Sequence, residues 1–228
     1  MRRLFSLLFS ATAISPAAAA TIAIIGTGDV AGALGPEFAA QGHTIVYGSR
    51  EPDRGDVQSL VARTGNGASA TTQADAVKGA DIVVLAVPGM LAPEIVKGLG
   101  DLSGKILIDP TNPLQRTEHG LEHGVDTSNA EIIQALAPGA RVVKAFNTLN
   151  YKIMIDPDKS GGPVSIPLVG DSDEAKATVA KLVEGMGLEP IDLGAVENAR
   201  WVEGMLILWI NNRISGRQPF DYYLRKTR

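Results

Sequence analysis

The feature that most constrains this chain is a short apolar strand that runs directly into a glycine-rich turn. Thr21–Ile25 is a continuous apolar run, and Gly26-Thr27-Gly28-Asp29-Val30-Ala31 follows it at once. Continuously apolar strands are typical of parallel sheets that are covered on both faces. A G-x-G-x-x-G/A turn between a strand and a helix is the dinucleotide-binding fingerprint. Gly26 permits the tight turn, Gly28 lets a pyrophosphate approach the backbone, and Ala31 lets the helix pack closely. The sequence therefore predicts an α/β, Rossmann-type fold.

The alternation of strands and helices continues along the next hundred residues. Further strands are predicted at Thr44–Tyr47, Asp81–Val87, Ile106–Ile108 and Arg141–Ala145. Ser128 and Glu131 form a capping box that opens a helix over Asn129–Leu136. Strands that alternate with helices indicate βαβ units, so we expect a parallel sheet over residues 21–148.

The pattern changes after residue 148. A loop rich in Pro, Gly and Asp is predicted over Asn147–Pro163. The elements expected after it are a strand at Val164–Val169, a helix over Asp173–Gly185, a strand at Leu188–Asp192 and a last helix from about Asn198 to Ile214. We expect residues 149–228 to form a small C-terminal α/β appendage. The last helix is apolar on most faces, which predicts burial in its own chain or against a partner subunit.

The end of the second predicted strand indicates which dinucleotide is bound. Proteins that bind NAD carry an acidic residue there, about 20 positions after the glycine turn, to accept a bond from the ribose 2′-hydroxyl. This chain has Ser49 and Arg50 instead, with Arg54 close behind. A charge-assisted contact to a 2′-phosphate contributes about 1.5–3 kcal/mol. The sequence therefore predicts NADP(H) in preference to NAD(H), although Glu51 acts against it.

Composition excludes several other functions. The net charge of −4 provides no basic field for nucleic acid, and the absence of cysteine excludes disulfides and thiolate metal sites. His119 and His123 are four residues apart, but the glycine-containing stretch between them reads as a loop, so we expect no metal site. The basic residues at the C-terminus, Arg225, Lys226 and Arg228, are expected to form a solvated tail.

The first 20 residues have the layout of a secretory signal peptide. Arg2 and Arg3 precede the apolar stretch Leu4–Ile14, and Ala18–Ala20 offers a small-residue cleavage site. The paired arginines only partly match a twin-arginine signal. A membrane anchor needs about 20 apolar residues and would have to consume the first strand. We therefore expect cleavage, no stable membrane span afterwards, and a periplasmic or exported protein, with a cytoplasmic enzyme as the alternative.

Several stretches in order along the chain resemble the NADPH-dependent deazaflavin (coenzyme F-420) reductase family and its bacterial relatives. The matching stretches are Gly26–Gly28, Gly42–Arg50, Asp109–Leu114, Val142–Thr148, Pro167–Lys176 and Gly187–Gly194. Each is short, but together they span residues 21 to about 205. The resemblance implies a Rossmann domain with a small C-terminal domain, a homodimer, and hydride exchange between NADPH and a flavin-like acceptor.

The resemblance also implies roles for individual residues. Thr27, Gly28, Asp29 and Val30 would bind the pyrophosphate. Ser49 and Arg50 would bind the 2′-phosphate, with Arg54 where the family carries a lysine. The residues expected along the nicotinamide are Ala86, Val87 and Ala145. The membrane ferric reductases of animals carry a related domain, so the acceptor could be a deazaflavin, a flavin or a ferric species.

Hydride transfer requires position rather than a protein nucleophile, so no catalytic side chain is predicted. Ligands of open parallel sheets bind beyond the carboxyl ends of the strands. This places Val87-Pro88, Asp109–Pro113 and Phe146–Thr148 around the nicotinamide and the acceptor. Asn112 and Asn147 are candidates to orient the amide or the acceptor, or equally to cap backbone. The predicted function is an NADPH-dependent reductase; the alternative is a non-catalytic NADP(H) carrier or sensor.

Overall fold

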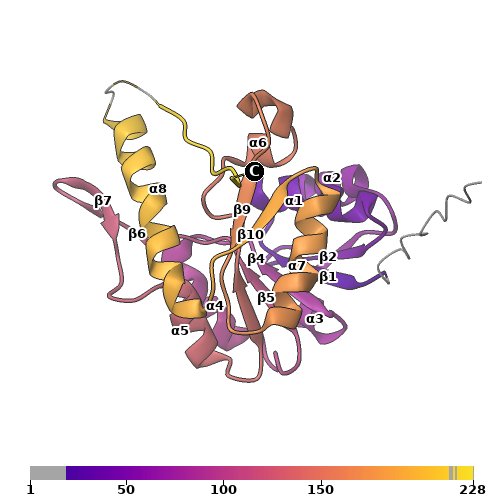
Figure 1. Ribbon diagram of the computed structural model, residues 1–228. Coiled ribbons are helices and arrows are strands. Elements are labelled where there is room, and N and C mark those ends of the chain that lie inside the picture. Colours follow the sequence, from indigo (N-terminus) through magenta and orange to yellow (C-terminus); the bar gives the residue numbers. More distant parts are fainter. Residues whose placement is uncertain (1–18, 216–217, 219, 228) are drawn as a thin grey trace, which may run out of the picture.

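The computed structural model describes residues 19–215, 218 and 220–227 (Figure 1). All but the last two residues of the predicted signal segment lie outside this range. The central sheet has six parallel strands in the order β3-β2-β1-β4-β5-β8. Their bounds are β1 Thr21–Ile25, β2 Thr44–Ser49, β3 Ser69–Thr72, β4 Ile82–Leu85, β5 Ile106–Asp109 and β8 Arg141–Lys144. The order is that of a dinucleotide-binding Rossmann sheet, which confirms the predicted fold class.

Helices cover both faces of the sheet, as the apolar strands require. Ile22 and Ile24 of β1 belong to one buried cluster, whereas Ala23 and Ile25 belong to another, because successive side chains of a strand point to opposite faces. The helices of this part are α1 Asp29–Ala40, α2 Gly55–Thr64, α3 Gln73–Lys78, α4 Ala92–Gly98 and α5 Asn129–Leu136. The predicted cap of α5 is present, since Ser128 Oγ accepts a hydrogen bond from the Glu131 backbone N–H at 3.1 Å.

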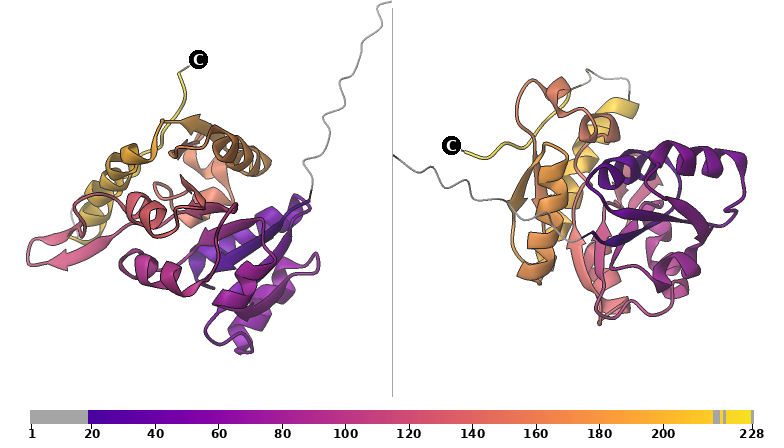
Figure 2. Two further views of the ribbon diagram at one scale, coloured as in Figure 1. Left: turned by 90° about the horizontal axis from the view of Figure 1, so that it is seen from below. Right: turned by 90° about the vertical axis from the view of Figure 1, so that its right-hand side faces the viewer.

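The C-terminal unit is a small α/β appendage, as predicted, and lies to one side of the Rossmann sheet (Figure 2). Its two parallel strands are β9 Ser165–Leu168 and β10 Glu189–Asp192, and its helices are α7 Asp173–Gly185 and α8 Ala199–Ile214. Two backbone hydrogen bonds between Lys144 and Val169 join β8 to the end of β9. The appendage therefore continues from the edge of the main sheet and shares its core.

Some elements were not predicted. The strand β3 was missed, and the expected loop around the histidines contains an antiparallel hairpin, β6 Leu114–Thr117 and β7 Gly120–His123. The predicted loop over Asn147–Pro163 contains a short helix, α6 Tyr151–Met154. Three 3-10 turns complete the described elements, at Gly89–Leu91, Pro157–Ser160 and Val196–Asn198.

Of the two alternatives predicted for the last helix, burial in its own chain is wrong, and burial against a partner subunit stays a prediction. Only Ala199, Val202 and Glu203 of α8 are buried, whereas Trp201 and Leu208 are each 72% exposed. The helix lies at the edge of the molecule beside the β6–β7 hairpin (Figure 1). Its apolar outer face is available to solvent or to a partner.

The C-terminal tail is also more ordered than a solvated segment. The Leu224 carbonyl oxygen accepts a hydrogen bond from the Ser165 backbone N–H at 2.8 Å. The guanidinium of Arg225 donates to the carbonyl oxygens of Pro163 and Ser160 at 3.0 and 2.9 Å. Residues 220–227 thus return along β9.

Among the described helices, none combines the length and the apolar character that crossing a membrane would demand.

Candidate functional site

The glycine turn after β1 is a close junction of three strand ends. Gly26 has φ +107°, and a Cβ added there would lie 2.1 Å from the carbonyl oxygen of Ala86, after β4. Its backbone N–H donates to the carbonyl oxygen of Gly48 in β2 at 2.9 Å. Only glycine fits this backbone conformation and this spacing.

Gly28 has the opposite surroundings. It caps the N-terminus of α1 with an ordinary φ of −84°, and no described heavy atom lies within 4 Å of the position of an added Cβ. The first N–H groups of a helix have no partner within the helix and attract anions. The turn thus holds open space where a phosphate would meet the start of α1.

A cavity of about 380 Å³ extends from this turn to the end of β2. The predicted site residues that line it are Gly26, Thr27, Gly28, Ser49, Arg50, Arg54, Ala86, Val87 and Pro88. Its other lining residues are Gly48, Gln73, Leu91, Glu94 and Ile95. Two predicted residues, Asp29 and Val30, instead form the first turn of α1 and do not line the cavity.

The groups at the end of β2 are suited to an anion. Ser49 is buried, and its Oγ accepts a hydrogen bond from the Glu51 backbone N–H at 3.1 Å, which leaves its own proton to donate. Arg50 is exposed and takes part in no ion pair with any described residue. Arg54 is engaged by Asp56 through bonds of 2.6 and 3.0 Å, both exposed. Arg50 is therefore the readily available cation, and Arg54 would have to exchange its partner.

Asn112 and Asn147 lie beyond the ends of β5 and β8 and bind each other. The Asn147 side-chain N–H₂ donates to Asn112 Oδ1 at 3.0 Å and to the Val202 carbonyl oxygen at 3.2 Å. The Asn112 side-chain N–H₂ donates to the Asn147 carbonyl oxygen at 3.1 Å. Asn147 Oδ1 is buried with no hydrogen-bond partner among the described residues. Ala145, just before this pair, is fully buried.

The turn between Ala145 and Asn147 is strained. Phe146 has φ +64°, a region that bulky side chains rarely adopt, and it is almost completely buried. Its ring meets that of Phe38 edge-on with the centroids 6.2 Å apart. Such strain persists only where packing holds it, often beside a functional site.

A buried ionic cluster at the end of β8 was not predicted. Lys144 has no exposed surface, and its Nζ lies 2.9 Å from Asp109 Oδ2 and 2.5 Å from Glu203 Oε1. It also donates to the Thr111 carbonyl oxygen. The three protons of the ammonium therefore have three acceptors, which buried charges require.

Glu203 extends this cluster to the hairpin and to α5. Its carboxylate accepts from the Asn129 backbone N–H at 3.0 Å, and Oε2 lies 2.8 Å from His123 Nε2. His123 Nδ1 faces the Val125 carbonyl oxygen at 2.7 Å, which can only accept, so Nδ1 carries a proton. The contact at Nε2 then needs a further proton shared by His123 and Glu203. Burial raises the pKa of Glu203, and the charge of Lys144 opposes this rise.

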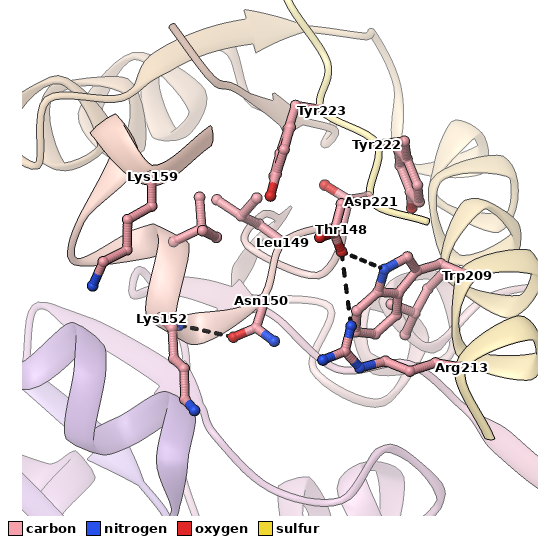
Figure 3. A pocket seen from close by; sticks show the side chains of 12 residues that line it. Thr148, Leu149, Asn150, Lys152, Lys159, Trp209, Arg213, Asp221, Tyr222 and Tyr223 are labelled. Atoms are coloured by element: carbon pink, nitrogen blue, oxygen red, sulfur yellow. Dashed lines mark hydrogen bonds and ion pairs between the residues drawn. The ribbon is translucent and has the colours of Figure 1, made fainter. Parts of the chain in front are cut away.

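A second cavity, of about 240 Å³, lies between the loop after β8, α6, α8 and the C-terminal tail (Figure 3). Neither the tail nor α6 was expected to contribute to a site.

In the part of the chain that the structure describes, no three His, Cys, Asp or Glu side chains are grouped so that they could hold a metal ion.

Comparison with known proteins gives consistent matches. Residues 21–113 match the family model of coenzyme F420-dependent NADP oxidoreductases. The F420-dependent NADP reductase of Methanothermobacter thermautotrophicus is 30% identical over 212 residues, which cover 86% of this chain and 90% of that protein. Metalloreductase STEAP3 of Rattus norvegicus is 33% identical over 192 residues, but the match covers only 37% of its length.

A solved structure matches over almost the whole chain. It is that of a candidate F420-dependent NADP reductase from Arthrobacter sp. FB24, with 33% identity and a TM-score of 0.80. The alignment covers 91% of this chain and 100% of that one.

Proposed function

This chain belongs to the coenzyme F420-dependent NADP oxidoreductase family and is an NADP-dependent oxidoreductase. On that premise we propose that NADPH reduces either a flavin or deazaflavin, which takes a hydride, or a ferric-type acceptor, of which two ions take one electron each. The observation that carries the proposal is the open space at Gly28, at the start of α1, in one cavity with Ser49 and Arg50. The first feature suits a pyrophosphate and the second a 2′-phosphate.

The cofactor would be held mainly by backbone and by charge. The pyrophosphate would occupy the space beside Gly28, where α1 presents unpaired N–H groups. Ser49 would donate its hydroxyl proton to the 2′-phosphate, and Arg50 would supply a charge-assisted bond. Arg54 would contribute only after leaving Asp56.

The reacting end would be oriented by the asparagine pair. The carboxamide of a nicotinamide has two N–H protons, and Asn147 Oδ1 is a buried acceptor without a partner among the described residues. A bond between them would remove the cost of that unsatisfied atom, about 1–3 kcal/mol. Asn112 would hold Asn147 in the required orientation. Bound NADPH would supply a hydride, and a flavin-type acceptor would take that hydride and one proton from water, which leaves NADP⁺.

A turnover assay tests the proposal. The purified protein is mixed with NADPH and each of a panel of flavins, coenzyme F420 and ferric chelates, and loss of NADPH absorbance is followed. Oxidation that depends on one acceptor and saturates with its concentration supports a reductase. Tight NADPH binding with no acceptor-dependent oxidation favours the alternative, an NADP(H) carrier or sensor.

The exposed face of α8 supports a homodimer. Trp201 and Leu208 are seven residues apart and therefore lie on one face of the helix, where both are 72% exposed. Exposed apolar patches on helices are frequent subunit contacts. Sedimentation equilibrium should give a dimer for the natural protein and a weaker dimer for Trp201→Glu. A monomer at micromolar concentration in the natural protein would exclude this contact.

We also propose that the segment Met1–Ala20 is a signal peptide that is removed, so that the protein acts outside the cytoplasm. The support is the sequence layout of two arginines, an apolar stretch and alanines, together with the start of β1 directly afterwards at Thr21. N-terminal sequencing of protein from fractionated cells should begin at Ala20 or Thr21 in the periplasmic fraction. A chain that begins at Met1 in the cytosol would contradict export.

A further inference from the structure

We infer that Lys144, Glu203 and His123 are positioning residues for the reaction: their buried network holds the asparagine pair, and one proton shared by Glu203 and His123 keeps the network closed. The inference rests on the proposed function, in which Asn147 orients the nicotinamide. Three observations carry it: the peptide groups that the network fixes, its extension to a wall of the cofactor cavity, and its balance of charge.

The ammonium of Lys144 holds the loop after β5. Its Nζ donates to the carbonyl oxygen of Thr111, which belongs to the peptide group that joins Thr111 to Asn112. Asp109 binds the same residue, because its Oδ1 accepts from the Thr111 backbone N–H at 2.9 Å and from the Thr111 hydroxyl at 2.6 Å. Asp109 Oδ2 in turn lies 2.9 Å from Lys144 Nζ. The buried ammonium and its carboxylate partner therefore fix the residue that directly precedes Asn112.

Glu203 holds the other half of the asparagine pair. The Val202 carbonyl oxygen, which accepts from the Asn147 side chain at 3.2 Å, belongs to the peptide group that joins Val202 to Glu203. The Glu203 carboxylate is completely buried and lies 2.5 Å from Lys144 Nζ. Lys144 itself is separated from Asn147 only by Ala145 and the strained Phe146. One ammonium thus connects α8 to the loop after β5, the two segments to which the Asn147 side chain is bonded.

The network also reaches a wall of the cofactor cavity. The Glu203 carboxylate accepts from the Asn129 backbone N–H at 3.0 Å, at the start of α5. The Asn129 side chain donates to the carbonyl oxygen of Gly89 at 2.8 Å. Gly89 follows Pro88, which lines the cavity, and a Cβ added to Gly89 would lie 1.9 Å from the Asn112 carbonyl oxygen. The cavity wall and the asparagine loop are therefore in close contact, and both depend on the network.

The charges of the network balance only when the shared proton is present. Lys144 carries one positive charge, whereas ionised Asp109 and Glu203 carry two negative charges, all on side chains with no exposed surface. An unbalanced charge in such a place is costly. The proton shared by Glu203 and His123 brings the sum to zero, whichever of the two holds it. Burial of the network therefore favours retention of this proton.

Other charged groups on the elements packed here are engaged elsewhere. Arg200 of α8 pairs with Glu131 of α5 at 2.5 Å, and Glu197, in the 3-10 turn before α8, adds a second negative charge near Arg200. Glu122 of β7 accepts a hydrogen bond from a hydroxyl of its own hairpin at 3.1 Å. Among the described residues, the titration of Glu203 therefore depends on the lysine, the aspartate and the histidine of the network.

Loss of the shared proton would open the network at the hairpin. The Val125 carbonyl oxygen keeps a proton on His123 Nδ1, so a lone pair at Nε2 would then face a carboxylate oxygen at 2.8 Å. Two acceptors at this distance repel each other. The proton would pass to water, since the His123 side chain is 21% exposed. The carboxylate of Glu203 would move away from the imidazole, and the Val202 carbonyl oxygen that binds Asn147 would move with it.

The variant Glu203→Gln copies the protonated network. Its side-chain oxygen can accept from Lys144 and from the Asn129 backbone N–H, and its N–H₂ can donate to Nε2 of a neutral His123. It has the shape of glutamate and keeps the charges balanced, but it has no proton that titrates. Glu203→Leu has a similar volume and no polar group, so it leaves the buried ammonium without one of its partners.

Binding of two nucleotides separates positioning from the rest of the cofactor site. NADPH reaches the asparagine pair through its nicotinamide, whereas 2′,5′-ADP carries the 2′-phosphate but no nicotinamide. In calorimetric titration, Glu203→Leu should weaken NADPH about five- to tenfold and 2′,5′-ADP less than about twofold. Glu203→Gln should restore most of the lost affinity for NADPH. The control Glu118→Gln, in the exposed turn of the same hairpin, should bind both nucleotides like the natural protein.

A pH series tests the shared proton. From about pH 7 to about pH 10, the affinity of the natural protein for NADPH should fall about five- to tenfold as the proton leaves. The affinity for 2′,5′-ADP should change less than about twofold, because the 2′-phosphate is ionised and Arg50 stays charged throughout. Glu203→Gln should show no fall, whereas Glu118→Gln should follow the natural protein.

The outcomes separate this inference from the proposed function. Equal weakening of both nucleotides in Glu203→Leu, or unchanged binding of both, would overturn the positioning role. The same fall with pH in the natural protein and in Glu203→Gln, or no fall in either, would overturn the shared proton. If Glu203→Leu does not fold, the pH series of the natural protein and Glu203→Gln decides. If the natural protein binds neither nucleotide, the proposed function fails and this inference fails with it.

Discussion

The two glycines of the turn after β1 give a sharp test, because the same substitution should have opposite effects two residues apart. Gly26→Ala places a methyl group 2.1 Å from the Ala86 carbonyl oxygen on a backbone with φ +107°. The dihedral costs about 1–2 kcal/mol, and forcing a methyl into filled space costs about 1–3 kcal/mol more. The total of roughly 2–5 kcal/mol should lower the melting temperature by roughly 4–20 °C for a chain of this size.

Gly28→Ala meets no such obstacle. Its φ of −84° suits any residue, and no described atom lies within 4 Å of the new methyl group. The lower entropy of the unfolded chain stabilises by about 0.4–1 kcal/mol. Alanine is a poorer N-cap than glycine by a similar amount. The free energy of unfolding should therefore change by less than about 1 kcal/mol.

Substitutions at Gly28, which should hardly change the folding stability, should strongly weaken cofactor binding. The new methyl group would occupy the space required by the pyrophosphate, so the Kd of NADPH should rise at least about tenfold for Gly28→Ala and further for Gly28→Val. Thermal denaturation measures the first effect, and titration of NADPH fluorescence measures the second. An unchanged Kd in both Gly28 variants would refute the cofactor site. A loss of stability equal to that of Gly26→Ala would refute the geometric argument.

Two further predictions concern charge. In calorimetric titration, NADPH should bind at least about tenfold more tightly than NADH. Arg50→Ala should weaken the binding of NADPH by about 1.5–3 kcal/mol and that of NADH hardly at all, whereas the control variant Arg116→Ala should change neither. Equal affinities for the two cofactors in the natural protein would contradict the assignment of Ser49 and Arg50. The pKa of Glu203 is raised above its ordinary value near 4.5 by burial, so the stability that this residue contributes is fully present below pH 4.5 and is lost as the pH rises through the raised pKa. Urea titrations at a series of pH values should show that the free energy of unfolding of the natural protein falls relative to that of Glu203→Gln as the pH rises. The difference between the natural protein and Glu118→Gln, on the exposed hairpin, should stay constant with pH. A constant difference for Glu203→Gln as well would mean that Glu203 has the same pKa in the folded and unfolded chain.

The sheet and the glycine turn could be predicted because their signals are local. The strands β1, β4 and β5 are rich in Ile, Val and Leu, and β8 has Val142 and Val143 at its centre. The predicted ends of all four strands lie within two residues of the observed ones. The ligand cavity follows from topology, because parallel strands end at one edge. Most of the residues predicted around the cofactor accordingly line one cavity.

The missed elements depend on contacts that the local pattern does not contain. Ser69–Thr72 has no large apolar residue, and it becomes strand β3 through backbone pairing with β2 at the sheet edge. The β6–β7 hairpin is short, and it is held by α8 through Asn211, whose side chain bonds both backbone groups of Leu121 at 2.7 and 2.6 Å. Partners 90 residues apart leave no periodic trace in the sequence.

Hydropathy gave the wrong burial for two parts of the chain, helix α8 and Lys144. An apolar helix and a lysine at the end of a strand predict, respectively, a buried helix and an exposed charge. In the structure the helix buries a carboxylate, Glu203, against the buried ammonium of Lys144, and it leaves Trp201 and Leu208 exposed. The charges compensate only because Asp109, 35 residues earlier, is brought to the same place by the neighbouring strand. Since removing one partner of a buried pair costs about 3–5 kcal/mol, the seating of α8 depends on these charges. The apolar side chains that made the helix look internal, Trp201 and Leu208, are thereby left exposed, which is the observation that supports the dimer contact proposed above.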